Sequence, residues 1–123
     1  MRLKVLDKLE IKVHYMNLHN EPFIKIKEQT KTIEMRLNDE KRQLLNIGDT
    51  IIFTNNLTKE TITCEVINLH HFDSFDSLYQ VFDKISIGYN ESDIASPKDM
   101  EIYYSNELIK KYGVLGIEIK VIG

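Results

Sequence analysis

The chain contains one cysteine, Cys64, and only two prolines and five glycines among its 123 residues. A single cysteine excludes an internal disulfide and a zinc site made of several cysteines. The few glycines and prolines form no linker, and no segment approaches the ~20 apolar residues of a membrane-spanning helix. Charged residues interrupt the N-terminal segment every two or three positions, unlike a secretory signal. We therefore expect one domain over residues 1–123, located in the cytoplasm and without a membrane partner.

The net charge of −3 excludes the strongly basic surface that is typical of general nucleic-acid-binding proteins. Basic residues are nevertheless concentrated in one stretch, because residues 25–42 contain six lysines and arginines against four acids. Most of the other acids lie in the second half of the chain. This asymmetry is compatible with a local basic groove in the first half.

Alternation of apolar and polar residues predicts five short strands. They are expected at residues 9–18, 31–37, 50–54, 61–69 and 114–122. In the first of them, Leu9, Ile11, Val13 and Tyr15 share one face, and Met16 and Leu18 continue the apolar pattern. That change of phase predicts a bulge near Tyr15 and Met16.

Helical spacing of apolar residues predicts helices over 20–28 and 74–84 and a helix pair over 98–111, with a loop over 85–97. Asn20, Ser74 or Asp73, and Ser105 are the expected N-caps. The strands after residue 46 follow one another as a hairpin meander without βαβ units. This order favours an α+β fold, a small and partly open β-barrel flanked by short helices.

The common motifs for phosphate binding, metal binding and nucleophilic catalysis are missing. The chain has neither a P-loop nor a GxGxxG motif. His70 and His71 are neighbours on a predicted strand and point to opposite faces, and His14 and His19 lie at opposite ends of one short segment. Cys64 lies in the middle of an apolar strand, where a core position is expected instead of a nucleophile. We expect neither a metal nor a cofactor.

The stretch from Lys31 to Arg36 is the exception. On a regular strand Thr32, Glu34 and Arg36 share one face, whereas Lys31 points to the other face with Ile33, Met35 and Leu37. A hydroxyl, an acid and a guanidinium on one barrel strand suit a nucleotide, because Arg binds phosphate or a base edge and Glu accepts from an exocyclic amine. The alternative is an edge strand with a solvated Glu–Arg pair.

The same stretch resembles the signature of the ASCH domain, a relative of PUA-like RNA-binding domains. That signature is Gly-x-Lys-x-x-Glu-x-Arg, and the chain reads Gln29-Thr30-Lys31-Thr32-Ile33-Glu34-Met35-Arg36. The lysine, glutamate and arginine match, whereas Gln29 replaces the glycine. The resemblance continues through residues 36–42, 47–53 and 111–117 and so covers nearly the whole chain in order.

The resemblance implies a small β-barrel whose groove binds RNA or a modified nucleotide through Lys31, Glu34 and Arg36. Asn38, Lys41 and Arg42 are further candidates for the rim of this groove. Three tyrosines are candidates for a surface on which bases stack; they are Tyr103, Tyr104 and Tyr112.

Three other functions remain open at this point. Some small ASCH proteins deacetylate acetylcytidine with a lysine, a threonine and a glutamate, and an enzyme of this kind would use Lys31 and Glu34. The subgroup's threonine stands where this chain has Glu34. Lys31 would need a bulge to reach the Glu34 face. Asp83 and Glu91 are the positions considered for the distal acid. Ribonuclease activity, proposed for other relatives, and a protein-interaction role are the remaining alternatives.

Overall fold

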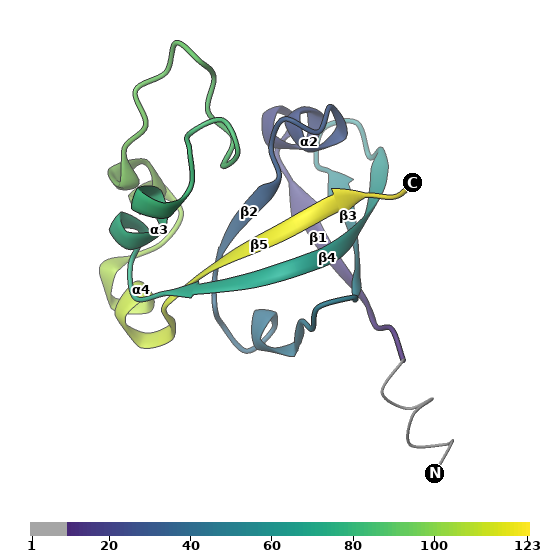
Figure 1. The fold of residues 1–123 in the computed structure, drawn as a ribbon, viewed down its shortest axis with the longest axis horizontal. Coiled ribbons are helices and arrows are strands. Elements are labelled where there is room, and N and C mark those ends of the chain that lie inside the picture. The colour runs from purple at the N-terminus through teal and green to yellow at the C-terminus, as the bar shows by residue number, and fades with distance from the viewer. Residues whose placement is uncertain (1–9) are drawn as a thin grey trace.

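A computed structural model describes residues 10–123 and shows a five-stranded sheet that curls into a half-barrel (Figure 1). The order of strands in the sheet is β1-β3-β4-β5-β2. Their bounds are β1 Val13–Leu18, β2 Ile33–Leu37, β3 Thr50–Asn55, β4 Thr61–Phe72 and β5 Val114–Val121. β1 pairs with β3 in parallel and all other pairs are antiparallel, so β3, β4 and β5 form the predicted meander. The prediction of an α+β fold with a partly open barrel is confirmed.

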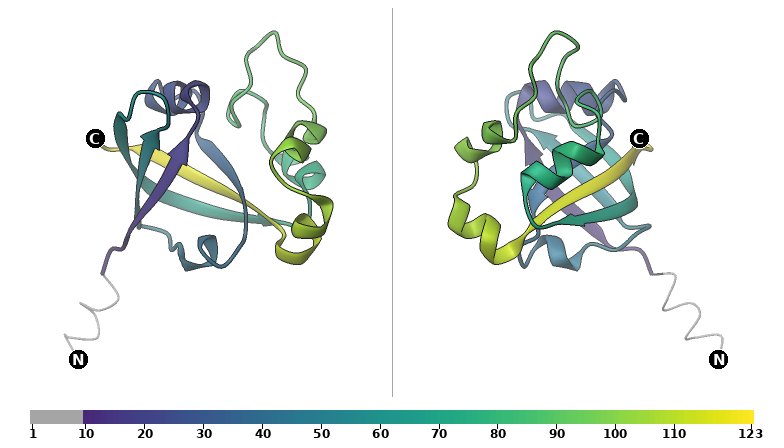
Figure 2. Two further views of the ribbon diagram at one scale, coloured as in Figure 1. Left: turned by 180° about the vertical axis from the view of Figure 1, so that it is seen from behind. Right: turned by 60° about the vertical axis from the view of Figure 1, so that its left-hand side comes forward.

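Short helices surround this sheet, and none of those described is long and apolar enough to span a membrane. Their bounds are α2 Asn20–Lys27, α3 Phe75–Val81, α4 Asn106–Tyr112, and the 3₁₀ helices η1 Arg42–Leu44 and η2 Pro97–Ile102. Helix α2 crosses one end of the half-barrel, while α3, η2 and α4 gather on one side of it with the loop between α3 and η2 (Figure 2). This helical side packs against β2, which is an edge strand of the half-barrel.

Two apolar clusters result from this arrangement. The first fills the half-barrel with side chains from the strands and with Phe23 and Ile26 from α2. Cys64 belongs to it and is fully buried, and burial raises the pKa of its thiol to about 11, so its predicted core role is confirmed. The second cluster joins Ile33 and Met35 of β2 to the helical side. Glu34 and Arg36 alternate with Ile33 and Met35 along β2 and therefore start from its other face.

The orientation of β1 differs from the prediction. Met16 and Leu18 face the core, while Val13 and Tyr15 are exposed. The register with β3 runs without a break from Val13 to Leu18, so the predicted bulge near Tyr15 is wrong; the irregularity lies in β4, between Val66 and Asn68. Leu9 lies outside the described residues.

The predicted N-caps are correct for two of three helices. Ser74 and Ser105 accept hydrogen bonds from backbone N–H groups in the first turns of α3 and α4. Asn20 is not a cap, because α2 begins at Asn20 itself and His19 precedes it without a side-chain cap. The Asn20 amide instead accepts a hydrogen bond from buried Asn55 at 2.8 Å and ties α2 to the end of β3.

Candidate functional site

The turn after α2 places the first residue of the signature. The backbone N–H of Gln29 bonds to Ile26 O and that of Thr30 bonds to Lys25 O, which is the Schellman arrangement of a helix C-terminus. Gln29 has a φ of 67°, the left-handed conformation that glycine adopts without cost. The chain therefore keeps the turn of the signature although it lacks the glycine.

The structure corrects the predicted position of Lys31. Its backbone N–H bonds to Lys25 O, so Lys31 belongs to the turn, and the strand begins only at Ile33. Lys31 is therefore free of the alternation of β2, and its Nζ lies 2.9 Å from Glu34 Oε1. The expectation that Lys31 points away from Glu34, and needs a bulge to reach it, is wrong.

Glu34 is a buried carboxylate between two cations. It has 4% of its surface exposed; Oε1 contacts Lys31, and Oε2 accepts a hydrogen bond of 2.7 Å from Arg36 Nε. Burial alone would raise the pKa of Glu34, but the charges and hydrogen bonds of Lys31 and Arg36 outweigh burial and lower this pKa to about 2. Glu34 is therefore ionised at neutral pH and fixes both cations in place.

Arg36 also bridges the two edges of the half-barrel. Its Nη2 donates to Asn17 O of β1 at 2.8 Å, while its Nε is held by Glu34. Two of its five N–H groups are thus used within the described residues, and three remain for a ligand. The Arg36 side chain thus connects the two edge strands, β1 and β2, and a cavity lies beside this side chain.

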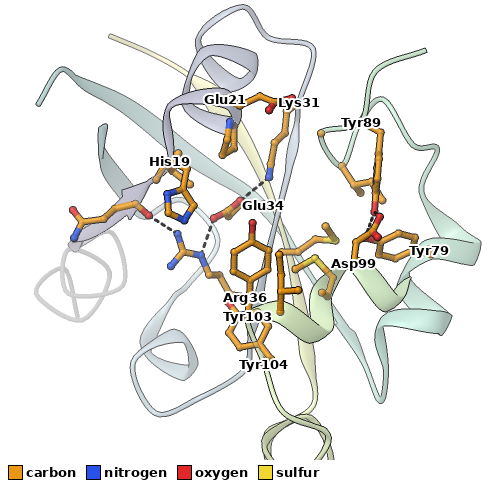
Figure 3. Close-up of a pocket in the computed structure, with 18 of the residues that line it drawn as sticks. His19, Glu21, Lys31, Glu34, Arg36, Tyr79, Tyr89, Asp99, Tyr103 and Tyr104 are labelled. Atoms are coloured by element: carbon orange, nitrogen blue, oxygen red, sulfur yellow. Dashed lines mark hydrogen bonds and ion pairs between the residues drawn. The ribbon is translucent and has the colours of Figure 1, made fainter. Parts of the chain in front are cut away.

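This cavity has a volume of about 390 Å³ and lies between β2, the end of β1 and the helical side (Figure 3). The signature residues Lys31, Glu34 and Arg36 all line it. Its other polar and aromatic residues are Asn17, His19, Glu21, Asn56, Tyr79, Tyr89, Asp99, Tyr103 and Tyr104. A cavity of this size, with apolar walls and a few converging polar groups, is typical of a small-ligand site.

Two of the three tyrosines predicted for stacking line the cavity. Tyr103 is 55% exposed and its ring lies 6.3 Å from that of His19, whereas Tyr104 stacks on Phe75 at 5.9 Å. Burial raises the pKa of Tyr104, which keeps it a neutral phenol at neutral pH. Tyr112 is not among the lining residues, and its hydroxyl donates to Glu40 on the surface.

A second polar group lines the cavity apart from the signature. The hydroxyls of Tyr79 and Tyr89 are 2.8 Å apart, and the Tyr89 hydroxyl lies 2.6 Å from Asp99 Oδ2. These three residues come from α3, from the following loop and from η2. Sequence reasoning missed them, because nothing local marks residues ten positions apart as neighbours.

The candidates for the rim do not line the cavity. Lys41 Nζ donates to Tyr15 O of β1, Arg42 pairs with Asp39 at 3.3 Å, and Asn38 is half-buried beside them.

The acids considered for a hydrolase also lie away from the cavity. Asp83 accepts from two backbone N–H groups of the next turn, and Glu91 is exposed on the loop.

The histidines do not join the signature in a metal site, since no three His, Cys, Asp or Glu side chains of residues 10–123 are grouped to hold a metal. His14 lies 2.8 Å from Asp49 Oδ2, and His70 lies 2.9 Å from Glu118. His19 is the one whose ring lines the cavity.

The curled five-stranded sheet with its short helices defines an α+β fold of the PUA-like class. Within this class the chain belongs to the ASCH family, because the sequence profile of the ASCH domain matches residues 16–123. The crystal structure of the hypothetical protein PH0355 is 30% identical, with a TM-score of 0.76 over 89% of this chain and 99% of that one. The NMR structure of protein PF0455 from Pyrococcus furiosus is 29% identical, with a TM-score of 0.66 over 89% and 97%. Among the curated proteins, none matches this chain.

Proposed function

We propose that the protein binds RNA or a nucleotide in the cavity lined by Lys31, Glu34 and Arg36. Membership in the ASCH family is consistent with RNA binding. The observation that carries the proposal is the buried Glu34 carboxylate, which holds an ammonium at 2.9 Å and a guanidinium at 2.7 Å at the wall of a cavity of about 390 Å³. Replacement of a whole buried ion pair by apolar side chains often costs no stability, although removal of one partner is strongly destabilising. Positioning of its donors is therefore the better account of this arrangement.

The geometry supports a division of roles among the three residues. Glu34 orients both cations, and each of its carboxylate oxygens already contacts one of them. The N–H groups of Lys31 and Arg36 that Glu34 and Asn17 leave unused point to carbonyl, ring-nitrogen or phosphate acceptors of the ligand. Tyr103, exposed at the cavity, offers a face on which a base stacks.

The test is a titration of nucleosides, nucleotides and short RNAs, read by thermal unfolding, on wild type, Lys31→Met and Arg36→Gln. A ligand at ~100 times its Kd stabilises the folded state by about 2.7 kcal/mol, which is readily measured. We expect such a stabilisation for wild type and its loss in both variants. Circular dichroism of the unliganded variants checks that they are folded.

The matched control is Arg42→Gln, which removes an arginine that does not line the cavity. We expect this variant to bind as wild type does. Equal losses in Arg36→Gln and Arg42→Gln would contradict a site confined to the cavity, and no stabilisation of wild type by any of these ligands would contradict the proposal itself.

A further inference from the structure

The chain of tyrosines that ends on Asp99 forms a second polar arm of the cavity, hereafter the Asp99 arm (Tyr79, Tyr89 and Asp99). Figure 3 shows this arm apart from the contacts of Lys31, Glu34 and Arg36. Its hydrogen bonds measure 2.8 Å between the two hydroxyls and 2.6 Å from Tyr89 to Asp99 Oδ2, and the Tyr89 hydroxyl also lies 3.1 Å from Ser96 O.

The direction of these hydrogen bonds follows from the atoms involved. A carboxylate and a carbonyl only accept, so the single proton of the Tyr89 hydroxyl is directed toward Asp99 and Ser96. Tyr79 must then be the donor to Tyr89. Burial raises the pKa of both tyrosines, which keeps the protons on them at neutral pH. Both hydroxyl protons of the arm therefore point toward Asp99. The carboxylate at the end of the arm is a hydrogen-bond acceptor.

One acceptor of Asp99 is left for a ligand. Tyr89 uses Oδ2, while Oδ1 takes part in no hydrogen bond within the described residues. Lys31 and Arg36 supply N–H donors at another part of the same cavity. The cavity thus combines donors on one wall with a negatively charged acceptor on another, and the acids Glu21, Glu34 and Asp99 outnumber its two bases.

This pattern of donors and acceptor defines a ligand chemistry. An exocyclic amino group of a nucleobase presents N–H donors that a carboxylate accepts, whereas a carbonyl at the same place is repelled. We propose that Asp99, positioned by Tyr89 and Tyr79, selects bases that carry an exocyclic amine. The inference rests on the proposed function, since it assigns the class of base that the same cavity takes.

Matched pairs of nucleosides test the selection by isothermal titration. Cytidine and uridine differ in an amine against a carbonyl and also at N3, which accepts in cytidine and carries a hydrogen in uridine. Guanosine and inosine differ in one amino group only and are therefore the stricter pair. A hydrogen bond to a charged group corresponds to about 10- to 100-fold in affinity. We expect wild type to prefer cytidine and guanosine by at least about tenfold, and Asp99→Asn to reduce both preferences to about threefold or less.

Two further variants separate selection from loop stability. Tyr89→Phe, which removes the hydroxyl that holds Asp99, is expected to lower the preference while uridine binding stays near its wild-type value. Glu101→Gln removes an exposed acid of the same 3₁₀ helix and is expected to change nothing. A role of the arm in holding the loop alone would weaken all four nucleosides equally.

Equal binding of cytidine and uridine by wild type, or an unchanged preference in Asp99→Asn, overturns the inference. If the four nucleosides bind equally and Arg36→Gln abolishes their binding, the proposed function stands and this selection fails. If none of the four binds, this selection fails as well, and the titration with nucleotides and RNA decides the proposed function by itself.

Discussion

Glu34 is the residue on which the geometry of the cavity depends. Because Lys31 and Arg36 lower its pKa from 4.5 to about 2 despite burial, its ionised form stabilises the folded state. This difference in pKa between the folded and the unfolded chain corresponds to about 3 kcal/mol of unfolding free energy. The contribution is fully present above pH 4.5 and is lost as the pH falls toward 2. Glu34→Gln should lose most of this contribution at neutral pH.

Urea unfolding of wild type and Glu34→Gln between pH 7 and pH 2.5 measures this contribution. We expect the difference in unfolding free energy between the two proteins to be large at pH 7 and to shrink below pH 4.5, as Glu34 begins to be protonated in the unfolded chain. A difference that is the same at all these pH values would contradict the ion pairs described for Glu34.

Gln29 leads to a prediction on stability alone. It adopts a φ of 67° at the end of α2, where glycine avoids a steric cost. Gln29→Gly is therefore expected to raise the unfolding free energy by about 1 kcal/mol, since relief of strain exceeds the entropy that glycine adds to the unfolded chain. Thr30→Gly, at the next position and without positive φ, is the control and should lower it. Destabilisation by Gln29→Gly would argue against this turn.

The loop between α3 and η2 holds Lys31 from the helical side. Ser86 O accepts from the backbone N–H groups of Thr32 and Ile33, and Gly88 O accepts from Lys25 Nζ at 2.7 Å. Gly88 has a φ of +112°, and a Cβ there would lie 3.1 Å from Lys31 Cδ. The absence of a side chain at Gly88 therefore makes room for the Lys31 side chain.

Gly88→Ala should lower stability, because alanine is strained at the positive φ of Gly88. It should also weaken ligand binding, because the added Cβ displaces the Lys31 side chain. Gly48 is the matched control, because its φ is +94° but no atom lies within 4 Å of an added Cβ. We expect both alanine variants to lower the unfolding temperature, and only Gly88→Ala to weaken binding as well, by about tenfold if one hydrogen bond from Lys31 is lost. Equal affinities of the two variants would show that Lys31 tolerates displacement.

Helices and strands were predictable from the sequence wherever neighbouring residues determine them. Alternation identified β3 and β5, and Ser74 and Ser105 marked the starts of α3 and α4. The prediction failed where a hydrogen bond to a residue outside the strand determines the conformation. Lys31 does not follow the alternation of β2, because its backbone N–H bonds to Lys25 O. Residues 85–97 read as an irregular loop, and the sequence alone does not show that Tyr89 within it meets Tyr79 and Asp99.

The charge of the whole molecule limits how RNA can bind. The net charge is −3, and the bases that line the cavity are Lys31 and Arg36, both paired with Glu34. The other four bases of the stretch 25–42 are engaged elsewhere: Lys25 with Glu21, Lys27 with Glu60, Lys41 with Tyr15 O, and Arg42 with Asp39. Few phosphates can therefore be neutralised at once.

This charge distribution predicts a weak dependence of affinity on salt. For single-stranded RNA, log K falls with log salt with a slope of about −0.7 for each phosphate neutralised. Two cations at most give a slope between 0 and about −1.4, which fluorescence anisotropy of a labelled short RNA measures between ~50 and ~200 mM salt. A slope of about −3 or steeper would require phosphate contacts from at least four cations. At least two cations outside the cavity would then have to contact the RNA, and the ligand would be a strand laid across the surface instead of one base held in the cavity.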